Sequence, residues 1–163
     1  MNVFITGGTG FIGSHLARRL AADGHSLRCL ARPTSRTDEL RALGAEIITA
    51  ELHDRAALTR AMQGCDWLFH LANLYTMWHP HPQEFQRTNV EGTRCVMEAA
   101  LAAGVGKVVY LSTVAVLGKP AGRPFNEDSQ PGPRQFSAYG RSKAAGDRLV
   151  QQMVRERGLP AVT

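Results

Sequence analysis

Short apolar runs alternate along the chain with longer segments whose apolar residues recur at helical spacing. The first run, residues 2–6, is rich in β-branched and aromatic residues and stops at a cluster of glycines, which predicts a strand. Over residues 11–22 the apolar positions follow a helical period, and Gly24 stands where that helix would end. The chain therefore opens with a predicted strand, a glycine-rich turn and a helix.

The alternation continues through the rest of the chain. Further strands are predicted at residues 27–31, 46–49, 67–72 and 107–112, and further helices at residues 37–43, 54–62, 83–103 and 138–157. A loop rich in glycine and proline is expected over residues 118–133. Strands that alternate with helices of this length favour right-handed crossovers. The expected fold is a doubly wound parallel α/β sheet, a Rossmann fold, with helices on both faces.

The last residues, 159–163, resemble the opening of a sixth strand, and the sequence ends within it. We therefore expect the chain to be truncated there. The 163 residues, 44% of them hydrophobic, favour one domain that spans residues 1–163.

Composition excludes some partners and compartments. No apolar run approaches the roughly 18 residues of a membrane span, so we expect a cytoplasmic protein that is not bound to membranes. The net charge is +5, but the basic residues are scattered without a basic run, which argues against nucleic acid as a partner. Cys29, Cys65 and Cys95 lie far apart and form no C-x-x-C pair, as expected of free thiols.

The glycine-rich turn, TGGTGFIG at residues 6–13, fits both G-x-G-x-x-G and the wider G-x-x-G-x-x-G spacing. Such glycines allow a tight turn and a close approach of the backbone to a diphosphate, while the following helix offers unpaired N–H groups to the anion. Because this turn lies between a strand and a helix at the start of a β-α-β unit, we interpret it as a dinucleotide site. The expected contacts of this turn are Gly7, Thr9, Gly10, Phe11, Ile12 and Gly13.

The end of the second predicted strand bears on the choice of dinucleotide. Proteins that bind NAD place an Asp or Glu there to accept hydrogen bonds from the ribose hydroxyls, whereas this chain has Arg32. Arg32 and Arg36 are suited to bind a 2′-phosphate, since a guanidinium matches phosphate oxygens. NADP is therefore favoured over NAD, although two solvated surface arginines would leave the choice open.

Residues 139–143 (YGRSK) bring a phenol and an ammonium onto one face of a predicted helix. Lys143, together with the positive nicotinamide ring of a bound cofactor, would lower the pKa of Tyr139 and make the phenol a useful proton donor and acceptor near neutral pH. Thr113 follows the predicted strand 107–112, at the sheet edge where doubly wound folds bind ligands, and is suited to hold a substrate oxygen. Tyr139, Lys143 and Thr113 are the predicted catalytic residues.

Several motifs occur together and in order, and they resemble the extended short-chain dehydrogenases/reductases of the NAD-dependent epimerase/dehydratase family. They are TGGTGFIG, HLAN at residues 70–73, NVEGT at 89–93, LSTVAVLG at 111–118 and YGRSK. The resemblance covers essentially the whole chain. In detail the sequence is most similar to the dihydroflavonol reductase-like and sugar epimerase-like members, which implies an oxidoreductase whose substrate-binding C-terminal part does not follow residue 163.

The resemblance also implies roles for single residues. Tyr139 is the expected acid and base, Lys143 orients the nicotinamide ribose, and Thr113 matches the third catalytic residue. Glu51 and Leu52 match an Asp-Leu pair near the adenine, with Glu in place of Asp. The remaining expected residues are Leu71, Ala72 and Asn73, which would line the cofactor groove, and Asn89, which would support the active site. His70 is interpreted as a packed strand residue, and no metal is expected at His79 and His81 because no third ligand is evident.

Three functions stay open at this point. The first is a reductase that moves hydride between NADP and a ketone or alcohol. The second is a nucleotide-sugar epimerase or dehydratase with a tightly bound NAD, and the third is a module that binds dinucleotide without catalysis. The expected partners are a small carbonyl, alcohol or nucleotide-sugar substrate and, in a homodimer, a second copy of the chain.

Overall fold

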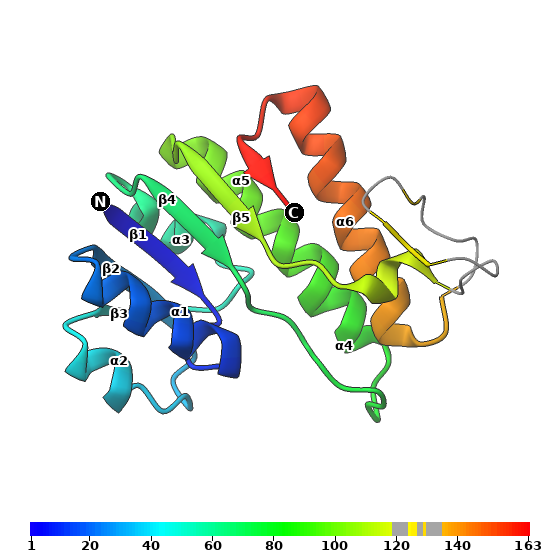
Figure 1. Ribbon diagram of the computed structural model, residues 1–163, viewed down its shortest axis with the longest axis horizontal. Helices are drawn as coiled ribbons and strands as arrows, with labels where there is room; N and C mark the ends of the chain where they lie inside the picture. The colour runs from blue at the N-terminus through cyan, green and yellow to red at the C-terminus, as the bar shows by residue number, and fades with distance from the viewer. Residues whose placement is uncertain (119–123, 127–128, 130–134) are drawn as a thin grey trace.

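A six-stranded parallel sheet organises the computed structural model, which describes residues 1–118, 124–126, 129 and 135–163 (Figure 1). The strand order is β3-β2-β1-β4-β5-β6. The strands are β1 (Asn2–Thr6), β2 (Ser26–Ala31), β3 (Glu46–Thr49), β4 (Trp67–His70), β5 (Lys107–Tyr110) and β6 (Ala161–Val162). The order reverses between β1 and β4, and a doubly wound sheet opens its ligand crevice at such a switch point. The predicted fold class is confirmed.

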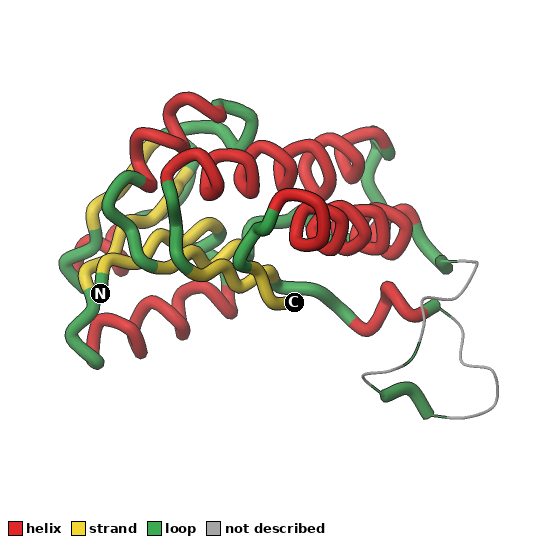
Figure 2. The backbone as a smooth tube through the Cα atoms, turned by 90° about the horizontal axis from the view of Figure 1, so that it is seen from above, coloured by secondary structure: helices red, strands yellow, loops and turns green. Residues whose placement is uncertain are grey.

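Helices cover both faces of the sheet (Figure 2). The helical segments are α1 (Phe11–Ala22), α2 (Asp38–Ala42), α3 (Arg55–Met62), α4 (Gln83–Gln86), η1 (Arg87–Gly92), α5 (Thr93–Ala103), η2 (Val114–Leu117) and α6 (Ala138–Arg157). Among the described residues, no helix combines the length and the apolarity that crossing a membrane requires.

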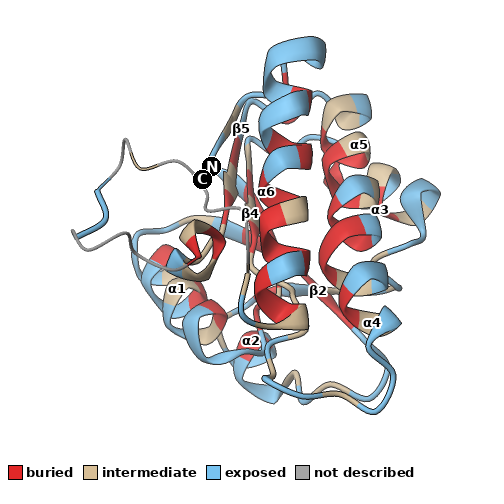
Figure 3. Ribbon diagram, turned by 90° about the vertical axis from the view of Figure 1, so that its right-hand side faces the viewer, coloured by how far each residue is buried: buried red, intermediate tan, exposed pale blue. Residues whose placement is uncertain are grey.

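Two buried clusters fill the space between the helices and the sheet. Val3 and Ile5 of β1 pack with residues of α1 and α2, whereas Phe4 points to the opposite face and packs with residues of α3, α5 and α6. This split follows from the alternation of side chains along a strand. Buried residues accordingly form stripes along α5 and α6 (Figure 3). Both sheet faces are thus anchored, which fixes the positions of the loops at the strand ends.

The predicted helix over residues 83–103 is helical over its whole length but not regular. Between α4 and α5 the segment Arg87–Gly92 forms a π-helical turn, and it contains the buried Asn89. Such widened turns interrupt α-helices mostly at functional sites. Because the apolar periodicity of the sequence continues through this turn, the sequence predicted one uninterrupted helix here.

Strands β4 and β5 end at His70 and Tyr110, two residues earlier than predicted. Thr6, the last residue of β1, pairs with His70, and beyond it the chain turns away at Gly7. The Leu71 N–H still donates to the Thr6 carbonyl oxygen at 3.1 Å, but the pairing with β1 ends there, and the residues that follow lie at the edge of the sheet. The predicted loop over residues 118–133 lies mostly outside the described residues, at 119–123, 127–128 and 130–134.

Candidate active site

A cleft of about 1170 Å³ lies where the chain leaves β1, β4 and β5. The structure brings all but two of the predicted site residues to its walls. They are Gly7, Thr9, Gly10, Phe11, Ile12, Gly13, Arg32, Glu51, Leu52, Leu71, Ala72, Asn73, Thr113, Tyr139 and Lys143. The two exceptions are Arg36 and Asn89. The cleft therefore joins the glycine-rich turn at one end to the first turns of α6 at the other.

The glycine-rich turn needs its glycines for backbone space. Gly7 has a φ of 75°, and a Cβ there would lie 2.7 Å from the backbone nitrogen of Ala72. A Cβ on Gly13 would lie 2.8 Å from the Gly8 Cα. Gly10 is the N-cap of α1 and provides no side-chain cap, so the N–H groups at the start of this helix are left for another acceptor. This is the local geometry of an anion site at a helix N-terminus.

Arg32 follows β2 and lines the cleft together with Ser35. The place where a ribose-binding carboxylate would stand thus has a guanidinium and a hydroxyl. Arg36 is exposed and is not among the residues that line the cleft. Between the two arginines the chain turns, with a hydrogen bond of 2.9 Å from the Ser35 N–H to the Arg32 carbonyl oxygen.

Tyr139 and Thr113 meet on the cleft wall. Tyr139 lies in the first turn of α6, which Ser137 caps by accepting a hydrogen bond from the Gly140 N–H at 3.0 Å. Thr113 precedes η2, and its hydroxyl accepts from the Ala115 N–H at 3.3 Å. Burial raises the pKa of Tyr139, and a hydrogen bond with the Thr113 side chain partly opposes this. The pair can hold one oxygen atom between a phenol and a hydroxyl.

Lys143 is nearly inaccessible to solvent, and this burial lowers its pKa to about 8. Its ammonium donates to the Leu111 carbonyl oxygen at 2.7 Å and to the Tyr110 hydroxyl at 3.1 Å. The ammonium is directed toward Leu111 and Tyr110, and burial is the main cause that raises the pKa of Tyr139. That Lys143, together with a bound nicotinamide ring, lowers this pKa stays a prediction.

Asn89 lies behind the cleft rather than on its wall. Its Nδ2 donates to the Ser142 hydroxyl at 2.9 Å, and the same hydroxyl donates to the Tyr139 carbonyl at 2.8 Å. Its side chain also holds the backbone of Leu74. The geometry makes Asn89 a support for the two segments that carry cleft residues.

Tyr75 is a cleft residue that sequence reasoning missed. Its ring meets the ring of Tyr139 edge to face, with centroids 5.2 Å apart, although 74% of Tyr75 is exposed. An exposed tyrosine after a strand carries no motif. The sequence signal that would have indicated it is its position shortly after Asn73, since residues next to a cleft-lining segment lie at the same edge of the sheet.

His70 is buried, and both of its ring nitrogens have partners. Nδ1 lies 2.6 Å from the Thr6 hydroxyl and Nε2 lies 3.0 Å from the Thr93 hydroxyl. Burial, together with the nearby Lys143, lowers the pKa of His70 to about 3. His79 Nδ1 is engaged with the backbone of His81, and in the described part of the chain no three His, Cys, Asp or Glu residues gather as metal ligands would.

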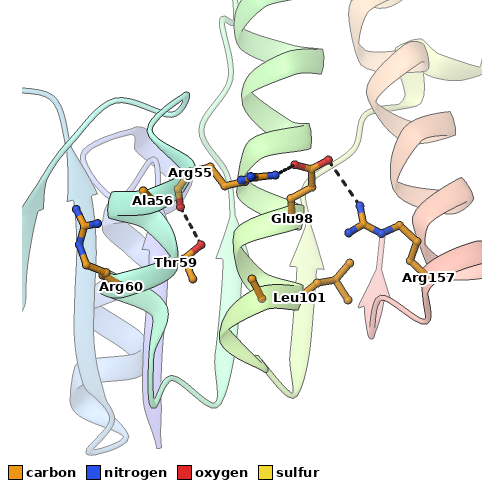
Figure 4. A pocket seen from close by; sticks show the side chains of 8 residues that line it. Arg55, Ala56, Thr59, Arg60, Glu98, Leu101 and Arg157 are labelled. Carbon is orange, nitrogen blue, oxygen red and sulfur yellow. Dashed lines mark hydrogen bonds and ion pairs between the residues drawn. The ribbon is translucent and has the colours of Figure 1, made fainter.

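A second hollow, of about 700 Å³, lies between α3, α5 and the end of α6 (Figure 4). Arg55 and Arg157 both point toward Glu98 there, at N–O distances of 2.9 and 3.6 Å. These charged side chains are thus paired with one another at the surface. The predicted catalytic residues line the first cleft and not this hollow.

Comparison with known proteins gives a family for this arrangement. A model described as the NAD dependent epimerase/dehydratase family matches residues 3–163. A putative dihydroflavonol 4-reductase of Synechocystis is 40% identical over 142 residues, which are 86% of this chain and 41% of that protein. A 4-hydroxy-2-methyl-3-oxo-4-farnesyl-3,4-dihydroquinoline-1-oxide ketoreductase of Stigmatella aurantiaca is 41% identical over 155 residues, which are 93% and 46% of the two chains.

Solved structures show the same architecture. The crystal structure of gox2253 is 42% identical with a TM-score of 0.90, over 98% of this chain and 49% of that one. The dTDP-glucose 4,6-dehydratase DesIV of Streptomyces venezuelae, with NAD and TYD bound, is 29% identical with a TM-score of 0.89, over 99% and 54%. The chain spans less than half the length of the two curated relatives that it matches.

Proposed function

Because the chain belongs to the NAD dependent epimerase/dehydratase family, we propose that it is the cofactor-binding and catalytic part of an NADP-dependent reductase that acts on a ketone or a secondary alcohol. The observation that carries the proposal is that Gly10, Arg32 and Tyr139 all line the same cleft. The glycine-rich turn, a guanidinium at the end of β2 and a buried phenol thus line one groove. The two named reductase relatives support the same reaction class.

The residues present fit a dinucleotide. The N-terminus of α1 and the close-packed glycines would hold the diphosphate, because a Cβ at Gly7 or Gly13 would clash with backbone. Arg32 and Ser35 would hold a 2′-phosphate. Asn73 Oδ1 is buried at the cleft and has no hydrogen-bond partner among the described residues, as expected of an atom that awaits a ligand. Lys143 would hold the nicotinamide ribose, with Glu51 and Leu52 near the adenine.

Bound NADPH would supply the hydride that adds to the carbonyl carbon. Tyr139 would give its phenol proton to the carbonyl oxygen as the C–O π bond breaks, and solvent would later restore that proton. Thr113, hydrogen-bonded to Tyr139, would donate to the same oxygen and hold it in line. Lys143 would stabilise the transient phenolate electrostatically, since it keeps a positive charge below pH 8. The reverse steps oxidise an alcohol.

The structural likeness to a dTDP-glucose 4,6-dehydratase with NAD bound favours a second candidate, an epimerase or dehydratase that takes a hydride and returns it. The two candidates differ in whether the cofactor changes overall. A reductase gives a net substrate-dependent change in absorbance at 340 nm, whereas an epimerase or dehydratase turns over without one.

The test separates binding from chemistry. Tyr139→Phe should bind NADPH within about threefold of the unaltered protein in a fluorescence titration, because the phenol oxygen is not part of the proposed diphosphate or phosphate sites. Its substrate-dependent oxidation of NADPH should fall by about a hundredfold or more, since general acid catalysis contributes factors of this size. Undiminished turnover would reject Tyr139 as the acid. If Tyr139→Phe loses turnover but still performs the role of the protein in the cell, the chain acts there as a dinucleotide-binding module.

A further inference from the structure

The side chain that holds Lys143 in place belongs to Tyr110, the last residue of β5. A lysine ammonium has three N–H groups, and this one gives two of them to the Tyr110 hydroxyl and the Leu111 carbonyl. The nitrogen also lies 4.4 Å from the centroid of the Tyr110 ring. Lys143 lines the cleft, so its third N–H remains for a ligand there.

The structure makes room for the Tyr110 hydroxyl at Gly146, one helical turn beyond the lysine. A Cβ on Gly146 would lie 2.7 Å from the hydroxyl oxygen and 2.9 Å from the Asn89 carbonyl oxygen. Tyr110 itself is only 2% exposed. Its hydroxyl thus fills a space that a glycine leaves open inside the packed interior, next to a buried cation.

Behind Tyr110 a neutral hydrogen-bonded chain crosses the sheet. Thr93 donates to the Asn89 carbonyl at 2.9 Å, so its oxygen accepts from His70 Nε2. His70 Nδ1 then accepts from the Thr6 hydroxyl, which itself accepts from the Ala72 N–H at 3.2 Å. His70 is therefore a satisfied neutral imidazole, stacked on Tyr110 with centroids 5.7 Å apart. It adds no positive charge that would compete with Lys143.

The charged and titratable groups that face Lys143 come from three elements. Asp147, one turn along α6, raises the lysine pKa, whereas burial lowers it further than Asp147 can restore. Asp147 is 9% exposed, and among the described residues its Oδ1 has no hydrogen-bond partner. Burial raises the pKa of its carboxyl, and the nearby Ser112 hydroxyl partly opposes this. Tyr110 of β5 and His70 of β4 are the others. Asp147 thus lies close enough to act on the lysine charge, but Tyr110 makes the direct side-chain contact.

We propose that Tyr110 is a positioning residue for Lys143: its hydroxyl, admitted by Gly146, accepts one ammonium N–H and leaves another directed at the cofactor site. The inference rests on the proposed function, in which Lys143 holds the nicotinamide ribose. Removing the hydroxyl leaves a buried ammonium with one acceptor fewer, which disfavours its charged form. Lys143 should then lose its proton at a lower pH.

The experiment uses Tyr110→Phe, which keeps the ring and removes one oxygen. NMR of the Lys143 Cε should show the titration midpoint lowered by about one pH unit, in a protein that unfolds cooperatively. With NADPH as the probe, the affinity loss should grow from below about twofold at pH 6 to about fivefold at pH 8, following the neutral fraction of Lys143. A merely structural role would give the same loss at every pH.

Two further variants keep the outcomes distinct. In a Lys143→Met background, Tyr110→Phe should no longer change the pH dependence of NADPH binding; an unchanged effect would overturn the inference. If Tyr110→Phe does not fold, Gly146→Ala displaces the same oxygen and should lower the Lys143 midpoint in the same direction. An unshifted midpoint in a folded variant also overturns it. A shifted midpoint with no NADPH binding in any form supports the positioning role and rejects the proposed function instead.

Discussion

Asn89 holds the backbone of Leu74 from both sides. Its Oδ1 accepts from the Leu74 N–H at 2.7 Å, and its Nδ2 donates to the Leu74 carbonyl at 3.2 Å. The same amide reaches Ser142 of α6. The π-helical turn of η1 thereby connects the segment that carries Tyr75 to the helix that carries Tyr139, and the edge contact of these two rings depends on one buried side chain.

Replacing Asn89 by Ala should therefore loosen both walls of the cleft. Three hydrogen bonds disappear and partly buried backbone groups of Leu74 lose their partners, which we expect to lower the free energy of unfolding by about 2–4 kcal/mol. Urea denaturation measures this loss. Asn2→Ala is a matched control, since the exposed Asn2 Nδ2 makes one bond, to the Gly64 carbonyl at 3.0 Å. A loss at Asn89 no larger than that at Asn2 would contradict the supporting role.

Arg32→Asp should change the choice of cofactor. The guanidinium at the cleft would lose its charge-assisted bonds to a 2′-phosphate, so the dissociation constant of NADP should rise by about tenfold to a hundredfold while that of NAD changes little. Isothermal titration with both cofactors measures the two constants. Arg36→Asp makes the same change of charge outside the cleft, and its effect on NADP should be several times smaller. Equal losses of NADP and NAD in Arg32→Asp would refute the assignment.

Gly13→Ala should abolish dinucleotide binding. The added Cβ would overlap the backbone of Gly7 and Gly8, and the turn can admit it only by opening, at a cost of about 3 kcal/mol or more in stability. Gly106→Ala is the control, because a Cβ there would meet its nearest atom, the Asp66 carbonyl oxygen, at an ordinary 3.5 Å. Thermal unfolding and NADPH titration should both separate the two variants. Native-like NADPH affinity in Gly13→Ala would count against a diphosphate seat at this turn.

The sequence predicted the elements best where their ends carry a local signal. α1 and α6 have the predicted bounds, and α6 is closed by Gly158 with a φ of 65°. Local patterns did not predict the π-helical turn at Asn89, since helical periodicity continues across it. They also could not indicate that Arg32 lines the cleft whereas Arg36 does not, because neighbouring residues in a turn point in different directions.

The candidate site divides in the same way. A glycine motif and a Y-x-x-x-K spacing are visible in sequence because their residues lie close together along one element. The contact of Lys143 with Tyr110 joins residues 33 positions apart, and it depends on how α6 packs against β5. The spacing in the sequence paired the lysine with its neighbour on the helix and gave no sign of this second partner on the sheet.

His70 should make the protein sensitive to acid. The pKa of His70 in the folded chain is about 3, below the ordinary imidazole value of 6.5, so between these values the unfolded chain binds a proton that the folded chain does not. Stability should be fully present above pH 6.5 and should fall as the pH decreases toward 3, with a contribution to the slope that approaches about 1.4 kcal/mol per pH unit. The raised pKa of Asp147 changes the stability in the opposite sense near its own titration.

His70→Gln keeps a polar side chain without the titration. Urea unfolding of the variant from pH 7 to 4 should therefore show a smaller slope of the free energy of unfolding against pH. An identical slope in the two proteins would show that His70 takes up its proton in the folded state, against the burial and the Thr6 and Thr93 contacts that this structure assigns to it.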